Sequence, residues 1–171
     1  MVRLLVISDT HSPRHMIPNE FYELFNDDND DSRIDGIIHC GDIQEVDVYE
    51  DLLSLGKPVY GVLGNNYDYS LARLLPRRRV IFFEDISIGI IHGNGASSQA
   101  IINARREFNQ EEVDLVCFGH SHIAATEFID ERCYFNPGSL TCSRKGNNSY
   151  GIIEIEGKAY KVYIKEIKKI N

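Results

Sequence analysis

The segment RLLVISDTH, residues 3–11, decides the fold class of this chain. Residues 3–8 form a short apolar run that ends in polar residues, which predicts a buried strand. Asp9 and His11 follow directly, two positions apart. In an extended segment such residues point to the same side, so both could reach one metal ion. Taken alone, a motif this short is more often a helix cap followed by a surface histidine.

Four further apolar runs end in the same way, with a glycine beside a polar residue. They lead into Gly41-Asp42, Gly64-Asn65, His92-Gly93 and Gly119-His120-Ser121-His122. Singly, each polar residue also fits an ordinary role as a cap or turn former. Together the polar residues that follow the five runs are two carboxylates, four imidazoles and one amide, the ligand inventory of a two-metal hydrolytic site. The set is Asp9, His11, Asp42, Asn65, His92, His120 and His122.

Strands and helices are expected to alternate over the first two thirds of the chain. The expected strands are residues 3–8, 34–40, 59–63, 80–83, 86–91 and 115–118, with a hairpin turn at 84–85. The expected helices are residues 18–25, 46–55 and 98–108, with a helix or turn at 71–75 and an acidic surface turn at 26–31. Short strands at 126–129, 133–135, 150–155 and 159–164 form an antiparallel tail.

This alternation predicts an α/β layered sandwich with one mixed sheet system. Ligands of open α/β sheets sit beyond the carboxyl ends of the strands, and the polar candidates follow five such ends. The length of 171 residues is expected to form one domain, residues 1–171.

Charge and hydropathy exclude several classes of function. The net charge is −8 and no basic patch with interleaved aromatics is present, so bulk nucleic-acid binding is not expected. No run approaches the roughly 18 apolar residues that span a membrane. The apolar N-terminus is too short for a signal peptide, so a cytoplasmic location is expected. The run Arg77-Arg78-Arg79 is interpreted as a solvated turn after Pro76, with the steering of an anionic substrate as the alternative.

The cysteines give no sign of a disulfide framework or a thiolate metal site. They are widely spaced and contain no CxxC pair, which favours reduced and mostly buried thiols. They are Cys40, Cys117, Cys133 and Cys142.

The five motifs, in this order, resemble the calcineurin-like metallophosphoesterase superfamily, whose pattern is D-x-H, G-D, G-N-H/D/C, H-G and G-H-x-H. The similarity is to its small single-domain branch of bacterial and archaeal phosphodiesterases. It runs from Val2 to about Ser139 and includes residues 38–42 and 136–139. The resemblance implies a sandwich of two mixed β-sheets flanked by α-helices, the metallophosphoesterase fold. It also implies a dinuclear metal-dependent phosphoesterase, with a phosphodiesterase favoured over a monoesterase.

The resemblance also implies two sets of metal ligands that share Asp42. The first set is Asp9, His11, Asp42 and His122. The second set is Asp42, Asn65, His92 and His120. Ligands rich in imidazole and without thiolate suit divalent transition metals, with Mn preferred and Ni, Fe, Co or Zn as alternatives. A hydroxide that bridges the two metals would attack the phosphorus of a phosphate ester, and Asp42, Asn65 and His92 would carry the catalytic roles.

Two neighbours of the motifs depart from the family pattern. Many members have histidine directly after the motif asparagine, where it is thought to protonate the leaving group, but this chain has Asn66. We therefore hypothesise that diesters and esters with good leaving groups are better substrates than alkyl monoesters. Relatives often have a further histidine where this chain has Asn94. His39 is expected to be a hydrogen-bonded residue of the core or beside the ligands. His15 is expected to be a surface residue near the mouth of the site, with a role as proton donor as the alternative.

A catalytically weak scaffold or protein-interaction module is the alternative function, by resemblance to the retromer subunit with this fold. The corresponding site of the retromer subunit also lacks the histidine after the motif asparagine. A metal-binding or nucleotide-sensing module without turnover is a third class. All seven expected ligand types are present here, whereas a decayed site would be expected to have lost at least one. A phosphate ester is the expected partner, no membrane partner is expected, and a homo-oligomer is left open.

Overall fold

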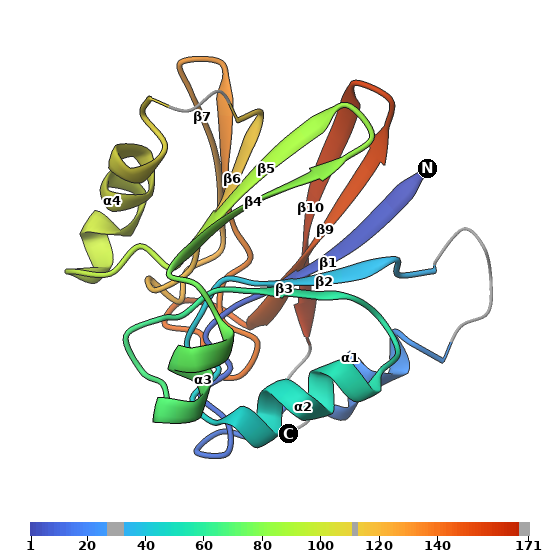
Figure 1. Ribbon diagram of the computed structural model, residues 1–171, viewed down its shortest axis with the longest axis vertical. Coiled ribbons are helices and arrows are strands. Elements are labelled where there is room, and N and C mark those ends of the chain that lie inside the picture. Colours follow the sequence, from blue (N-terminus) through green and yellow to red (C-terminus); the bar gives the residue numbers. More distant parts are fainter. Residues whose placement is uncertain (27–32, 111–112, 168–171) are drawn as a thin grey trace.

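The computed structural model describes residues 1–26, 33–110 and 113–167, so most of the expected acidic turn at 26–31 lies outside the described residues. Two mixed five-stranded sheets are present, with helices beside each of them (Figure 1). The strand order is β10-β9-β1-β2-β3 in the first sheet and β4-β5-β6-β8-β7 in the second. The two-sheet sandwich implied by the family resemblance is confirmed. The single mixed sheet system inferred from the alternation alone is wrong.

Parallel strands form the centre of the first sheet. β1 (Val2–Ile7) pairs in parallel with β2 (Gly36–His39), which pairs in parallel with β3 (Val59–Gly61). On its other side β1 pairs antiparallel with β9 (Asn148–Glu156), and β10 (Ala159–Ile167) forms the edge. The apolar run of residues 4–7, which ends β1, is buried on both faces of this sheet, and this explains why it does not alternate with polar residues.

The second sheet combines a hairpin with parallel strands. β4 (Arg78–Phe83) and β5 (Ile86–Ile91) form the hairpin expected around residues 84–85. β6 (Leu115–Cys117) pairs in parallel with both β5 and β8 (Arg132–Asn136), and β7 (Ala125–Ile129) closes the far edge. The expected antiparallel tail is therefore divided, because β7 and β8 join this sheet while β9 and β10 join the first one.

Short helices cover the outer faces of the sheets (Figure 1). α1 (Asn19–Glu23) and α2 (Val46–Ser54) bury Phe21 and Leu52 in one apolar cluster with Leu5 and Ile7 of β1. α3 (Tyr69–Leu74) packs near α2. The helix expected at 98–108 is divided into a 3₁₀ turn, η1 (Ser97–Gln99), and α4 (Ala100–Glu107). α4 packs on the outer face of the second sheet. None of the helices in the described residues is long and apolar enough to cross a membrane.

The main core lies between the two sheets. Leu4 and Val6 of β1 share an apolar cluster with Ile88 and Ile90 of β5 and with Phe135 of β8. Alternate residues of β1 thus face the second sheet, while the residues between them face the helices. Both sheets are locked to each other through this cluster, so the ends of their strands are held at fixed positions.

The arginine run does not form the turn that we expected. Arg78 and Arg79 are the first residues of β4 and pair with Ile91 and Ile90 of β5. The two-residue turn after Phe83 sets the hairpin register, and the pairing then continues back through both arginines. The cysteine prediction holds, since all four thiols are free and only Cys142 is not fully buried.

We predict that Phe108→Ala lowers the free energy of unfolding by about 3–5 kcal/mol, because Phe108, directly after α4, is fully buried and its ring lies against Gly89 of β5. Phe82→Ala is the matched control, since Phe82 is 73% exposed and its removal should change stability by less than about 0.5 kcal/mol. Equilibrium urea unfolding measures both. Equal losses in the two variants would contradict the packing described for α4.

Candidate metal centre

All seven predicted residues come together at the edge where the parallel strands end. His11 Nε2 lies 3.2 Å from His122 Nε2 and 3.5 Å from Asp42 Oδ2. On the other side of Asp42, His92 Nε2 lies 3.4 Å from Asp42 Oδ1 and 3.1 Å from Asn65 Oδ1. His120 Nδ1 lies 2.9 Å from the same Asn65 oxygen. Residues from the ends of five strands in two sheets therefore surround one small volume.

Left-handed backbone conformation aims most of these side chains. Five of the seven residues have positive φ angles, between 45° and 67°. They are Asp9, His11, Asp42, His120 and His122. Such angles are uncommon outside glycine and cluster at functional sites. Our expectation that Asp9 and His11 share a side because their segment is extended is therefore wrong. The two side chains converge because both residues turn left-handed, with His11 Nε2 3.8 Å from Asp9 Oδ1.

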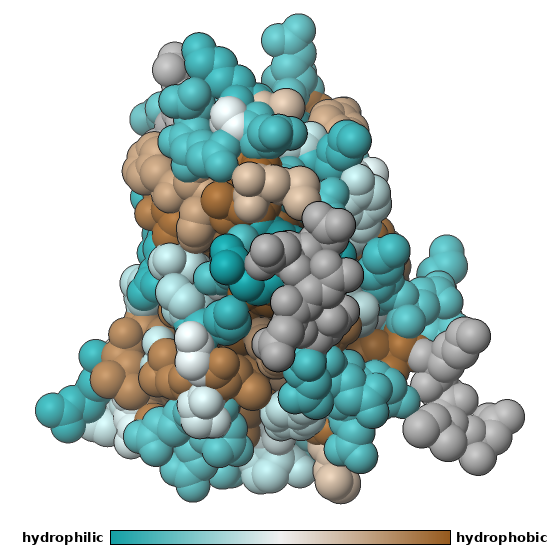
Figure 2. Space-filling view, turned by 90° about the vertical axis from the view of Figure 1, so that its right-hand side faces the viewer, coloured by the Kyte–Doolittle hydropathy of each residue, from teal (hydrophilic) through white to brown (hydrophobic). Residues whose placement is uncertain are grey.

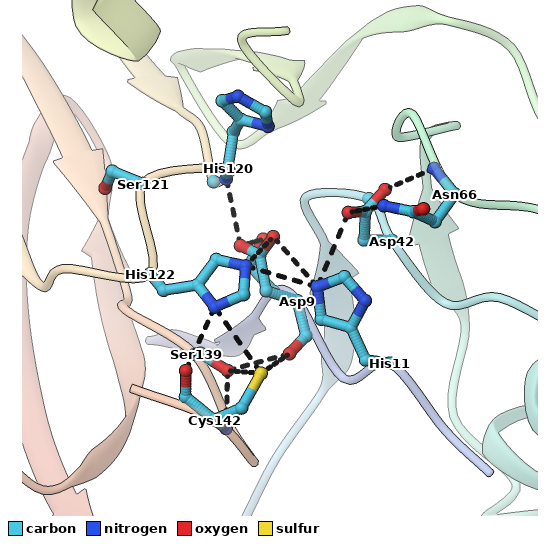
Figure 3. Close-up of polar contacts among 12 residues, drawn as sticks. Asp9, His11, Asp42, Asn66, His120, Ser121, His122, Ser139 and Cys142 are labelled. Atoms are coloured by element: carbon cyan, nitrogen blue, oxygen red, sulfur yellow. Dashed lines mark hydrogen bonds and ion pairs between the residues drawn. The ribbon is translucent and has the colours of Figure 1, made fainter. Parts of the chain in front are cut away.

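The Asp9 carboxylate is fully buried, and only one of its oxygens is hydrogen-bonded. Oδ2 accepts from Ser8 Oγ at 2.6 Å and from the His120 backbone N–H at 2.9 Å. Among the described residues none donates a hydrogen bond to Oδ1, although His122 Nε2 lies 3.2 Å away. A buried anionic oxygen without a donor needs a positive partner. Oδ1 is thus suited to a cation, and Figure 3 shows Asp9 between His11 and His122.

Asp42 lies between two groups of imidazoles. Its Oδ1 accepts from the backbone N–H groups of Asn65 and Asn66, both at 2.8 Å, and its Oδ2 accepts from Asn66 Nδ2 at 2.8 Å. These donors fix the carboxylate with one oxygen toward His92 and the other toward His11. A carboxylate held in this way can contact two cations at once.

Backbone carbonyls orient three of the four imidazoles. His92 Nδ1 lies 2.7 Å from Cys40 O, His122 Nδ1 lies 3.0 Å from Cys142 O, and His120 Nε2 lies 2.6 Å from Gly95 O. A carbonyl can only accept, so in each ring this nitrogen is the donor. The other nitrogen of each neutral ring then carries its lone pair toward the centre of the cluster. Ligating histidines are commonly oriented by such hydrogen bonds.

Charge coupling shifts the pKa values of the buried groups. Burial alone would lower the pKa of His122, but the nearby Asp9 carboxylate and Cys142 raise it to about 10. Burial would raise the pKa of Asp42, yet its bonds to His92 and Asn66 hold that pKa below its ordinary value. The cluster thus keeps its carboxylates ionised and raises the affinity of His122 for a proton, which competes with a cation for the same lone pair. A cation that enters must displace this proton.

Two motif glycines are required because of close approach. A Cβ atom on Gly64 would overlap the Asp42 carboxylate, and one on Gly119 would overlap Ser8 Oγ. Neither residue has a positive φ angle, whereas Gly41 has a φ of 100° and does form the sharp turn. The glycines therefore let neighbouring strand ends approach until their side chains can share ligands.

The two other histidines that we considered lie beside the cluster. His39 is fully buried, accepts from the Gly41 N–H at 3.2 Å and lies 3.2 Å from Thr10 Oγ1. Burial lowers the pKa of His39 to about 3, so it is neutral, and this agrees with the hydrogen-bonded core role that we expected. His15 lines an open cavity of about 280 Å³ above the cluster, together with Arg14 and Arg144.

Several contributors to the centre were not found from the sequence. The carbonyls of Cys40, Gly95 and Cys142 have no residue-type signature, because every residue carries a carbonyl. Ser139 Oγ donates to Asp9 O at 2.8 Å, and Asn136 Nδ2 donates to Gly119 O at 2.9 Å. The segment 136–139 was noticed as part of the pattern, but its role in tying the loops was not predicted.

Two separate groups of ligand atoms among the described residues could hold metal ions. One group consists of Asp9, Asp42 and His92, and the other consists of His11, His122 and Cys142. In each group the ligand atoms lie within 4.8 Å of one another. The second group includes a thiol that we did not expect, since Cys142 Sγ lies 3.4 Å from His122 Nδ1. The free Oδ1 of Asp9 and the inward lone pairs show that these residues fit divalent metal ions.

Comparisons with known proteins agree with this arrangement. The calcineurin-like phosphoesterase superfamily domain matches residues 2–158. A probable metallophosphoesterase of Methanocaldococcus jannaschii is 34% identical over 160 residues, which cover 90% of this chain and 76% of that protein. A phosphodiesterase of the same organism is 25% identical over 178 residues, covering 96% of this chain and all of that protein. Vps29 of Chaetomium thermophilum has a TM-score of 0.82 at 22% identity and covers 99% of this chain and 89% of its own, which shows a shared fold.

We predict that Gly64→Ala lowers the affinity for divalent metal by at least about 10-fold, because the new methyl group must displace the Asp42 carboxylate. Gly61→Ala is the control, since its Cβ would meet only Leu75 methyl groups at 3.3–3.4 Å. Metal content after dialysis, measured by mass spectrometry, reports binding, and thermal unfolding reports the fold. Unchanged metal content in a folded Gly64→Ala protein would show that the close approach has no role in the site.

Proposed function

The chain belongs to the calcineurin-like phosphoesterase superfamily, and from this premise we propose that it is a metal-dependent phosphodiesterase with a two-metal centre. The observation that carries the proposal is the buried Asp9 Oδ1, which has no hydrogen-bond donor among the described residues and is surrounded by imidazole nitrogens. The single domain over residues 1–171, the cytoplasmic location and a homo-oligomeric state stay predictions from the sequence.

We propose two ligand sets that share Asp42. One set consists of Asp9, His11, Asp42 and His122. The other consists of Asp42, Asn65, His92 and His120. Mn is the preferred metal on donor chemistry, with Ni, Fe, Co and Zn as alternatives. When bound, the two ions would supply a hydroxide nucleophile at neutral pH and polarise the phosphoryl oxygens.

The protein's own contribution is to hold these ligands in place. Asp42 receives three hydrogen bonds from Asn65 and Asn66, so its carboxylate stays ionised and fixed between the two sets. Asn65 Oδ1 and His92 Nε2 converge at 3.1 Å and would position the second ion. Arg14 and Arg144 line the cavity above the cluster, where their charges favour an anionic ester. Holding the ligands and the ester in fixed positions raises the rate of hydrolysis, and no covalent bond to the protein is needed.

The preference for diesters rests on Asn66. Its side-chain amide donates to Asp42 Oδ2 at 2.8 Å, so the residue supports the carboxylate and has no acidic proton to give. A leaving group without a proton donor must depart as an anion, which favours substrates with low leaving-group pKa values. The phosphodiesterase relative is consistent with this preference.

A scaffold function is the second candidate, and the Vps29 fold likeness is what favours it. Docking to a stable partner normally needs a large continuous apolar patch. The face shown in Figure 2 carries hydrophobic areas that are separated by hydrophilic residues. The most exposed large hydrophobic residues are separated along the chain, at Met16, Tyr69, Phe82 and Phe128. The complete ligand set supports the enzyme.

We predict that metal-loaded protein holds about two transition-metal ions per chain and hydrolyses bis(p-nitrophenyl) phosphate. Asp42→Asn should lower kcat/KM by at least about 1000-fold, because the shared carboxylate loses its charge. Asp51→Asn removes the same charge from the exposed surface of α2 and should leave the rate unchanged. A metal-free, inert wild-type protein would favour the scaffold.

We further predict a steep dependence of rate on the leaving group. p-Nitrophenyl phosphate should be hydrolysed faster than a simple alkyl phosphate by at least about 100-fold, because no histidine follows Asn65 to protonate the alkoxide. Asn66→His should narrow this ratio. Steady-state rates on both esters measure the effect, with His15→Asn tested in parallel because His15 lines the same cavity. Equal wild-type rates on the two esters would contradict the proposed role of Asn66.

A further inference from the structure

A second cavity adjoins the metal centre on the side of β4 and α4. It has a volume of about 280 Å³ and is lined by the ends of β3 and β5, the start of β4 and one face of α4. We call it the arginine pocket, after Arg77, Arg78 and Arg106. Glu107 is the one acidic residue among its described lining residues. A local excess of positive charge is notable in a chain whose net charge is −8.

Aromatic rings position two of the three arginines. The Arg78 guanidinium lies over the buried Phe108 ring, 4.5 Å from its centroid. Arg77 donates to Tyr67 Oη at 3.0 Å and lies 5.9 Å from the centroid of that ring. The contacts with Tyr67 hold the Arg77 guanidinium without neutralising its charge, and the Phe108 ring orients the Arg78 guanidinium. Two of the three guanidinium groups are therefore positioned before any ligand arrives, which lowers the entropy cost of binding.

The pocket and the metal centre share one wall. His92 belongs to the proposed ligands and also lines the pocket, as do the next residues Gly93 and Asn94. Gly95, one position further, accepts the hydrogen bond from His120 Nε2 at 2.6 Å. Asn103 of α4 donates to Asn94 O and fixes this loop. The loop formed by residues 92–95 thus contributes both to the metal centre and to the lining of the arginine pocket.

We propose that the arginine pocket binds a second phosphate group of the substrate. Arginine is the residue best suited to phosphate, because its planar guanidinium can donate two parallel hydrogen bonds. Asn94 and Asn103 add neutral amides to the lining. The preferred substrate is then a phosphate diester that carries a further phosphate, as in oligonucleotide ends, rather than a diester with one phosphate. This inference rests on the proposed function, since it assigns the substrate class of the same site.

The test uses two esters that differ by one phosphate group. They are thymidine 5′-(p-nitrophenyl phosphate) and its 3′-phosphorylated form, and both release the same nitrophenolate. We expect wild-type protein to show a KM about 10-fold lower for the 3′-phosphorylated ester, as charge-assisted hydrogen bonds of ordinary strength would give. The double variant Arg77→Gln/Arg106→Gln should lose this difference and keep the wild-type kcat and KM on the unphosphorylated ester.

Arg105→Gln is the matched control. Arg105 precedes Arg106 on α4, is exposed, pairs with Asp130 at 3.3 Å and does not line the arginine pocket. It should keep the full 10-fold difference. Equal KM values for both esters in wild-type protein would overturn the proposal. So would an equal rise in KM for both esters in the double variant, because that result would reveal only general steering of anions.

A binding experiment separates failure of this inference from failure of the proposed function. Thymidine 3′,5′-bisphosphate is titrated calorimetrically into metal-free protein, where the pocket does not depend on turnover. Heat of binding that is lost in the double variant and kept in Arg105→Gln supports the pocket even if neither ester is hydrolysed. No binding by wild-type protein overturns it. Inorganic phosphate that binds as tightly as the bisphosphate would also overturn it, because the pocket would then be a site for free phosphate.

Discussion

The burial of the Asp9 carboxylate at the junction of the two sheets is the constraint on which the rest of the site depends. Placing an ionised carboxylate where no water reaches costs several kcal/mol unless donors or cations replace the lost hydration. Ser8 from the first sheet and the His120 N–H from the second satisfy Oδ2. The same carboxylate therefore joins the sheets and leaves Oδ1 for a positive partner.

A second cost comes from the backbone. Five of the proposed ligands have left-handed φ angles, a conformation that costs about 1 kcal/mol or more for each residue that is not glycine. Hydrogen bonds between the loops hold them there: Asp9 N–H donates to Gly41 O, and His11 N–H donates to Asp42 O, both at 3.0 Å. The inter-sheet core fixes where those loops begin. The packing between the two sheets thus helps to keep the proposed ligands in their left-handed backbone conformation.

The strands and the polar residues at their ends could be predicted from the sequence, because a buried strand is an apolar run and the residue after it is polar. All seven predicted ligands meet, at the ends of β1, β2, β3, β5 and β6. The means of their meeting could not be predicted. The left-handed turns occur at Asp and His rather than glycine, and the orienting acceptors are backbone carbonyls. Neither the left-handed backbone angles nor the carbonyl acceptors can be recognised from the residue types in the sequence. The division of the last strands between two sheets also depends on long-range pairing, which local periodicity does not encode.

The arginine run shows how one hairpin couples chemistry to specificity. Arg78 pairs with Ile91, the residue directly before His92, so the register that ends β5 at a proposed ligand also places the arginines beside it. A shift of one residue would turn Arg78 to the opposite face of the sheet, away from the Phe108 ring. The two-residue turn at residues 84–85 therefore determines both that His92 joins the proposed ligands and that the arginines lie beside it. If the pocket binds as proposed, the ligand set can stay constant while the residues at the start of β4 change, and substrate choice can then vary without loss of the proposed metal centre.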